Sequence, residues 1–107
     1  LTLPSTNLVA KAAAAVSDPI EKFTMITGEI LRQAQLALKI HPTNKYRRQE
    51  YVRAHEAYMR SISLSAERNR IRNQPKQVIR DFENYVSKEA DYFVEYVSDK
   101  VDNFVEQ

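Results

Sequence analysis

The sequence predicts an all-α fold, an up-down helical bundle with one short and three long helices. One Gly and four Pro among 107 residues are too few for a turn-rich β fold. Apolar residues recur every three or four positions over long stretches, which is the helical period, and no alternating strand pattern competes. We therefore expect one domain over residues 1–107, with helices at about 6–16, 19–40, 44–73 and 75–106.

The first two helices are marked by prolines and capping residues. The first follows Pro4 and contains the alanine run of residues 12–15, which favours helix. The second begins at Asp18-Pro19-Ile20-Glu21, where Asp18 is the expected N-cap and Glu21 completes a capping box. Its predicted apolar stripe consists of Ile20, Phe23, Ile30, Leu31, Ala34 and Leu38. Gly28 lies inside this helix and costs about 1 kcal/mol relative to Ala, unless a neighbouring backbone needs the space.

The third and fourth helices carry longer periodic patterns. His41-Pro42-Thr43-Asn44 ends the second helix and caps the third. The buried seam expected on the third helix is Tyr51, His55, Tyr58, Ile62, Ser65 and Asn69, flanked by Val52, Met59 and Ala66. Pro75 opens the last helix, whose apolar stripe covers more than a third of the circumference and predicts more than one helical neighbour.

Charge is divided unevenly along the chain. Residues 41–79 hold nine Lys/Arg against three Glu, a net charge of +6. Residues 80–107 hold three Lys/Arg against eight Asp/Glu, a net charge of −5. The overall charge of +2 therefore conceals a basic middle and an acidic end. Any function must account for what the basic surface faces.

Catalysis, cofactors and membrane insertion are not expected. There is no Cys, and the two histidines, His41 and His55, lack the Glu-x-x-His spacing of di-metal bundles. A single Gly cannot form a phosphate-binding loop. The longest apolar stretch, residues 8–16, is too short for a bilayer and contains Lys11. We expect a non-enzymatic protein without metal or cofactor, and the absence of Cys suits the cytoplasm.

The basic cluster is the strongest functional signal, because seven Arg occur in the 26 residues 47–72. Guanidinium groups suit phosphate and carboxylate partners, and Tyr46 and Tyr51 can stack on unpaired bases. The alternative is that the arginines pair with carboxylates of the same chain or of another subunit. The candidate contacts to RNA or DNA are Arg47, Arg48, Arg53, Arg60, Arg68, Arg70, Arg72 and Lys76.

The aromatic stripe of the last helix also has two interpretations. Core packing accounts for most of it, but its tyrosines and charged groups are polar for the centre of a monomer. Such residues are typical of a surface where two subunits meet, so we expect a homo-oligomer. The candidate interface residues are Tyr85, Glu89, Tyr92, Tyr96 and Lys100.

The segment Lys22–Ile30, the apolar run to Leu38 and the Arg-rich third helix together resemble one family. It is the four-helix-bundle group of diversity-generating retroelement accessory variability proteins and rRNA intervening-sequence proteins. The resemblance covers about residues 20–80, and the acidic end of the chain, without Gly or Trp, departs from the family pattern. It implies a non-enzymatic, ring-forming accessory protein that binds nucleic acid and a reverse transcriptase.

Two functions follow as expectations. In the first, an oligomeric helical-bundle accessory protein binds nucleic-acid backbone through its basic third helix. In the second, the chain is a structural or adapter bundle for protein–protein interaction, such as a virion component, an effector or a secretion partner, and its arginines meet acidic protein surfaces. Charge reversal at the arginines separates the two, because only the first function predicts a change in nucleic-acid affinity.

Overall fold

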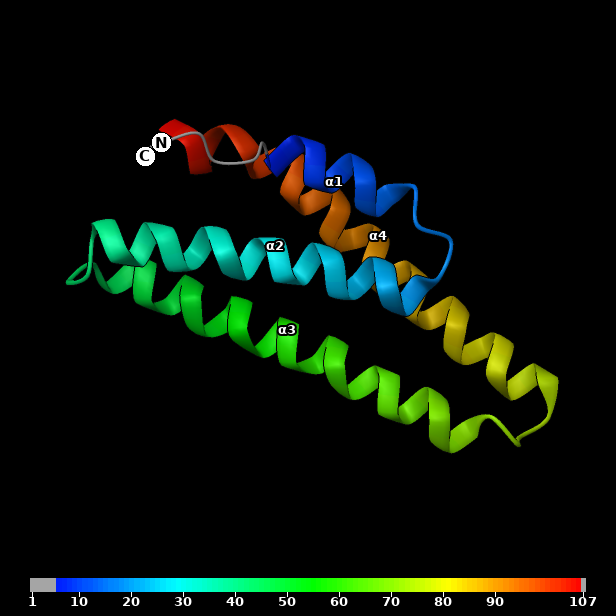
Figure 1. Ribbon diagram of the computed structural model, residues 1–107. Helices are drawn as coiled ribbons and strands as arrows, with labels where there is room; N and C mark the ends of the chain where they lie inside the picture. The colour runs from blue at the N-terminus through cyan, green and yellow to red at the C-terminus, as the bar shows by residue number, and fades with distance from the viewer. Residues whose placement is uncertain (1–5, 107) are drawn as a thin grey trace.

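The computed structural model confirms the all-α fold (Figure 1). It describes residues 6–106, with side chains placed for residues 8–97. Its helices are α1 (Thr6–Ala14), α2 (Pro19–Ile40), α3 (Lys45–Ile71) and α4 (Lys76–Glu106), and no strand occurs in the described range. Four expected boundaries shift by one or two residues, because α1 ends at residue 14 instead of 16, α3 spans 45–71 instead of 44–73, and α4 begins at residue 76 instead of 75. α1 ends early because Val16 N bonds to Ala13 O at 3.1 Å, a tightened last turn.

α2 is the central helix of the bundle. α3 lies along one side of α2, and α4 crosses its other side, where α1 also packs (Figure 1). α4 contacts both α1 and α2, as the width of its apolar stripe predicted. α3 and α4 contact each other least among the packed pairs, and they diverge from their connection like the arms of a V (Figure 1). The molecule is elongated, with extents of 48 × 25 × 19 Å.

Side-chain caps fix the starts of α2 and α3. The Asp18 carboxylate accepts a hydrogen bond from Ile20 N at 3.0 Å, which confirms Asp18 as the N-cap of α2. The Asn44 side-chain oxygen accepts from Arg47 N at 3.1 Å and caps α3. Each cap satisfies one of the backbone N–H groups that a helix start leaves without a partner.

The core consists of two clusters that meet along α2. One gathers α1, the middle of α2, α3 and α4, and its buried members are Ala10, Ala13, Ile26, Ile30, Ala34, Ala54 and Val97. The other joins the start of α2 to α4, and its buried members are Ile20, Phe23, Val86 and Ala90. Phe23 is fully buried and meets Phe93 edge-on, with ring centroids 5.5 Å apart. This aromatic contact fixes the crossing of α2 and α4.

The burial predicted for the seam of α3 is wrong for four of its six residues. His55, Ile62, Ser65 and Asn69 are exposed, whereas Tyr51 and Tyr58 are half-buried. The buried residues of α3 are Arg47, Ala54 and Ser61 instead.

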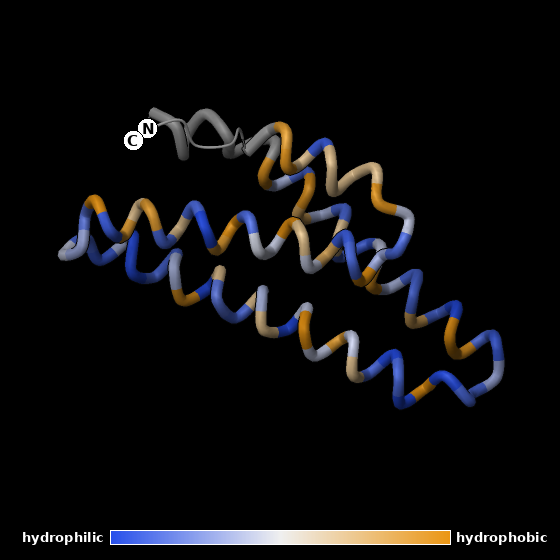
Figure 2. Tube along the Cα trace, in the orientation of Figure 1, coloured by the Kyte–Doolittle hydropathy of each residue, from blue (hydrophilic) through white to orange (hydrophobic). Residues whose placement is uncertain are grey.

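Small residues explain this rotation of α3. The hydroxyls of Thr27 and Ser61 lie 3.2 Å apart between α2 and α3. A Cβ added at Gly28 would meet the Tyr58 ring at 3.4 Å, so Gly28 faces a side chain rather than a neighbouring backbone. The helices approach closely at these positions, which turns the larger apolar residues of α3 outward. Figure 2 shows the hydrophilic residues that dominate α3.

Candidate interaction surface

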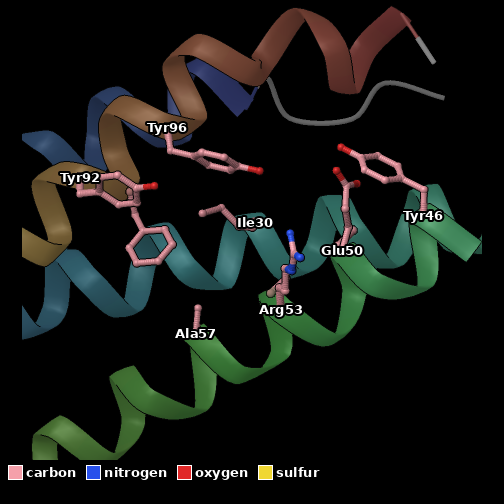
Figure 3. Close-up of a pocket in the computed structure, with 10 residues that line it drawn as sticks. Ile30, Tyr46, Glu50, Arg53, Ala57, Tyr92 and Tyr96 are labelled. Carbon is pink, nitrogen blue, oxygen red and sulfur yellow. The ribbon is translucent and has the colours of Figure 1, made fainter.

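A groove lies between α3 and α4, with α2 as its floor (Figure 3). It encloses about 300 Å³ at the wide end of the V. Small residues leave this space open, because Ala34, Ala54 and Ala57 do not extend across it. The remaining lining residues are Ile30, Tyr46, Glu50, Arg53, Tyr92, Phe93 and Tyr96.

The walls of the groove are aromatic and carry few polar groups. Tyr46 and Tyr92 are exposed, Tyr92 at 62% of its surface, while Tyr96 is half-buried. Arg53 and Glu50 project from α3 between these rings (Figure 3). An apolar floor with aromatic walls and a few convergent polar groups is typical of a binding surface.

Two of these tyrosines have raised pKa values. Burial raises the pKa of Tyr96, and the negative charges of Glu50 and ionised Tyr92 add to the effect. A hydrogen bond with Glu50, together with its charge, raises the pKa of Tyr46. Both phenols are therefore neutral at physiological pH. They can offer apolar ring surface and a hydrogen-bond donor, but not a phenolate nucleophile.

Half of the predicted nucleic-acid contacts are ion-paired within the chain. Arg47 is only 7% exposed and bonds to Glu50 at 3.3 Å. Arg60 joins α3 to α4 through Glu89 at 3.0 Å and also donates to the Tyr85 hydroxyl. The other two pairs are Arg68 with Asp18 at 2.8 Å, and Arg70 with Glu67.

The other four, Arg48, Arg53, Arg72 and Lys76, are exposed. They form no ion pair with any described residue. Arg48 and Arg53 belong to the first half of α3, whereas Arg72 and Lys76 flank the α3–α4 connection. Arg53 and Arg72 are about 28 Å apart along the helix axis, at about 1.5 Å per residue. The structure therefore splits the unpaired cations into two groups.

The predicted oligomer-interface residues lie along the side of α4 that is turned toward α3. Tyr92 and Tyr96 form a wall of the groove, and Tyr85 and Glu89 lie nearer the narrow end of the V. The Tyr85 hydroxyl donates to Glu89 Oε1 at 2.9 Å. Lys100 belongs to α4, but its side chain lies outside the described residues.

Contrary to the buried seam expected from the sequence, α3 carries an exposed apolar stripe. Val52 is 53% exposed and Met59 47%, and Ile62 lies exposed one turn further on. The sequence feature that indicates this orientation is the seven-residue spacing of the buried residues Arg47, Ala54 and Ser61. Ala54 and Ser61 are small and permit close packing against α2. We use the term α3–α4 face for the groove-lining residues together with Tyr85, so Val52 and Met59 lie outside it.

Neither a cluster of metal ligands nor a membrane-spanning helix is found in the part of the chain that the structure describes. Within that part, no three His, Asp or Glu side chains gather to hold a metal ion. His55 is exposed and stacks on Tyr51, with ring centroids 6.1 Å apart. None of the helices searched combines the length and apolarity needed to cross a bilayer.

No protein-family model matches the chain, and comparison with curated proteins and with solved structures likewise finds no match. The surface between α3 and α4 is therefore interpreted from its own chemistry.

Proposed function

We propose that the chain is a non-enzymatic protein–protein interaction bundle that binds its partner through the α3–α4 face. The observation that carries this proposal is the open groove, whose walls are exposed tyrosines and whose floor is apolar. Large exposed aromatic residues around a recess are typical of binding surfaces, and Tyr and Arg are enriched among the residues that dominate binding energy.

Apolar burial provides the driving force. Tyr46, Tyr85 and Tyr92 are all large side chains of the α3–α4 face that remain substantially exposed. Covering one such side chain contributes about 1.5–3 kcal/mol before the cost of association is subtracted. Several of them on one surface are enough to support a stable complex.

The pairing of the arginines also favours a protein partner over nucleic acid. Arg47, Arg60, Arg68 and Arg70 already contact carboxylates of the same chain. A nucleic-acid phosphate would have to displace those carboxylates. Each displaced pair reduces the net gain from phosphate binding and from counterion release.

A second function, binding of nucleic-acid backbone, is favoured by one observation. Arg48, Arg53, Arg72 and Lys76 are exposed and have no carboxylate partner among the described residues. The resemblance to retroelement accessory proteins would place such a chain beside a reverse transcriptase. In this case the phosphates would contact two separate groups of cations rather than one continuous strip.

Fluorescence anisotropy of a labelled single-stranded RNA, titrated with protein across a salt series, separates the two functions. The proposed function predicts weak binding that disappears near physiological salt. Micromolar binding at that salt, weakened by both Arg48→Glu and Arg72→Glu, would overturn it in favour of the second function. Lys39→Glu is the matched control, because it makes the same charge change on exposed α2 surface.

A further inference from the structure

We infer that the partner in the groove is α4 from a second copy of this chain, which forms a two-fold symmetric dimer. This inference rests on the proposed function, since it names the occupant of the same α3–α4 face. In the dimer, α4 of each copy covers the open side of the groove between α3 and α4 of the other and inserts a ring into it. The groove thereby gains the long helix that its open side lacks.

The exposed edge of α4 matches the groove in chemistry. Tyr92 stands on this edge with most of its surface in solvent, and Tyr85 is exposed two turns earlier. The groove offers an apolar floor of Ile30 and alanines, with room for an aromatic ring. Tyr92 then serves twice, as a wall in its own copy and as the inserted ring in the other. In a two-fold interface the same surface of each copy takes part, so one residue commonly both lines the site of its own copy and contacts the site of the other.

Charge selects α4 rather than α3 as the helix that covers the groove. The sequence of α3 holds seven basic and three acidic residues, a net charge of +4. That of α4 holds four basic and eight acidic residues, a net charge of −4. Covering the groove with α4 places an acidic helix against basic α3, whereas covering it with α3 would set two basic helices side by side. Complementary charges of this kind favour one docking orientation over others.

Specific unpaired groups support the same orientation. Arg53 on α3 lines the groove, and both it and Glu95 on α4 are exposed and have no ion-pair partner among the described residues. α3 and α4 run in opposite directions along the V (Figure 1). A two-fold axis along the groove therefore brings the first half of α3 alongside the second half of α4 from the second copy. This arrangement sets Arg53 near Glu95 of the second copy.

Sedimentation equilibrium of the full chain tests the dimer. We expect a mass of twice 12.4 kDa, with a dimer dissociation constant that rises with salt. Tyr92→Ala should weaken the dimer about tenfold or more, because it removes the inserted ring. Arg53→Glu and Glu95→Arg should each weaken it, and the double variant should recover much of the loss. Lys39→Glu should leave the dimer unchanged.

Three results would overturn the inference: a monomer at every concentration, a dimer unaffected by all of these variants, or a closed assembly of more than two copies. Circular dichroism of each variant confirms that it is folded, and the double variant keeps the test valid if a single reversal perturbs α3. If the chain is monomeric and also fails to bind RNA, the dimer is ruled out but the proposed function is not. Tight RNA binding at physiological salt would contradict the proposed function itself.

Discussion

The Nη1 atom of Arg68 donates hydrogen bonds of 2.8 and 2.9 Å to both carboxylate oxygens of Asp18. Asp18 Oδ1 also accepts from Ile20 N at 3.0 Å. One carboxylate therefore caps α2 and ties the α1–α2 connection to the last turn of α3. A residue that the sequence presents as a candidate phosphate contact serves instead to join helices that are distant in the sequence.

Replacing Arg68 by Ala should destabilise the fold by about 0.5–1 kcal/mol, since both partners are partly exposed and water screens the pair. Urea unfolding followed by circular dichroism measures this change. Arg72→Ala is the control, because Arg72 has no ion pair with a described residue and its loss should change stability by less than about 0.5 kcal/mol. Equal midpoints for the two variants would contradict the structural role of Arg68.

The stability that Asp18 contributes should depend on pH. Burial raises the pKa of Asp18, but hydrogen bonds from Arg68 and Ile20 N, with the Arg68 charge, hold it below its usual value. The contribution is therefore complete above the unfolded pKa of about 3.9 and is lost as pH falls through the lower folded-state pKa. The stability difference between wild type and Arg68→Ala should shrink below about pH 4. A difference that stays constant down to about pH 3 would exclude this linkage.

Phe23→Ala should cost about 3–5 kcal/mol, because the ring is fully buried and packs against Phe93. Thermal unfolding is the appropriate measurement. Leu8→Ala provides the comparison, since Leu8 is exposed and its loss should have little effect. Similar losses in the two variants would mean that the α2–α4 contact is not where the structure puts it.

Gly28→Ala should stabilise the fold by up to about 1 kcal/mol, which is the helix propensity gained. The added Cβ would lie 3.4 Å and 3.7 Å from Tyr58 ring carbons, an ordinary contact. Gly28→Leu should lose this gain, because a larger side chain would press on the same ring. A marked loss of stability in Gly28→Ala would show that α2 and α3 lie closer together than described.

Substitutions at Ser61 test the close approach of α2 and α3 from the α3 side. Ser61→Ala should change stability by less than about 1 kcal/mol, because the Thr27 hydroxyl keeps its bond to Phe23 O at 2.7 Å. Ser61→Leu should cost about 1–3 kcal/mol, since the site is fully buried. Chemical denaturation of both variants makes the comparison. Tolerance of Leu would contradict tight packing at this position.

Local signals predicted the helices well because they act over a few residues. Asp18 and Asn44 cap the helices that their sequence positions indicated, and the prolines near both sites mark the same boundaries. The wide stripe of α4 correctly indicated several neighbours, because covering so much apolar surface requires more than one helix. The rotation of α3 was not predicted, because its large apolar residues do not occupy the buried side.

The sequence by itself determined the all-α class, the number of helices, their approximate boundaries and the opposite charges of α3 and α4. Each of these depends on periodicity, capping or composition, which are local properties. Only the tertiary structure decided that α3 packs through Ala54 and Ser61, which leaves Val52 and Met59 in solvent. It also decided which arginines find carboxylates, because Arg68 and Asp18 are brought together by helix packing rather than by sequence proximity. The groove between α3 and α4 exists for the same reason, since its open end depends on the angle at which those two helices diverge from each other.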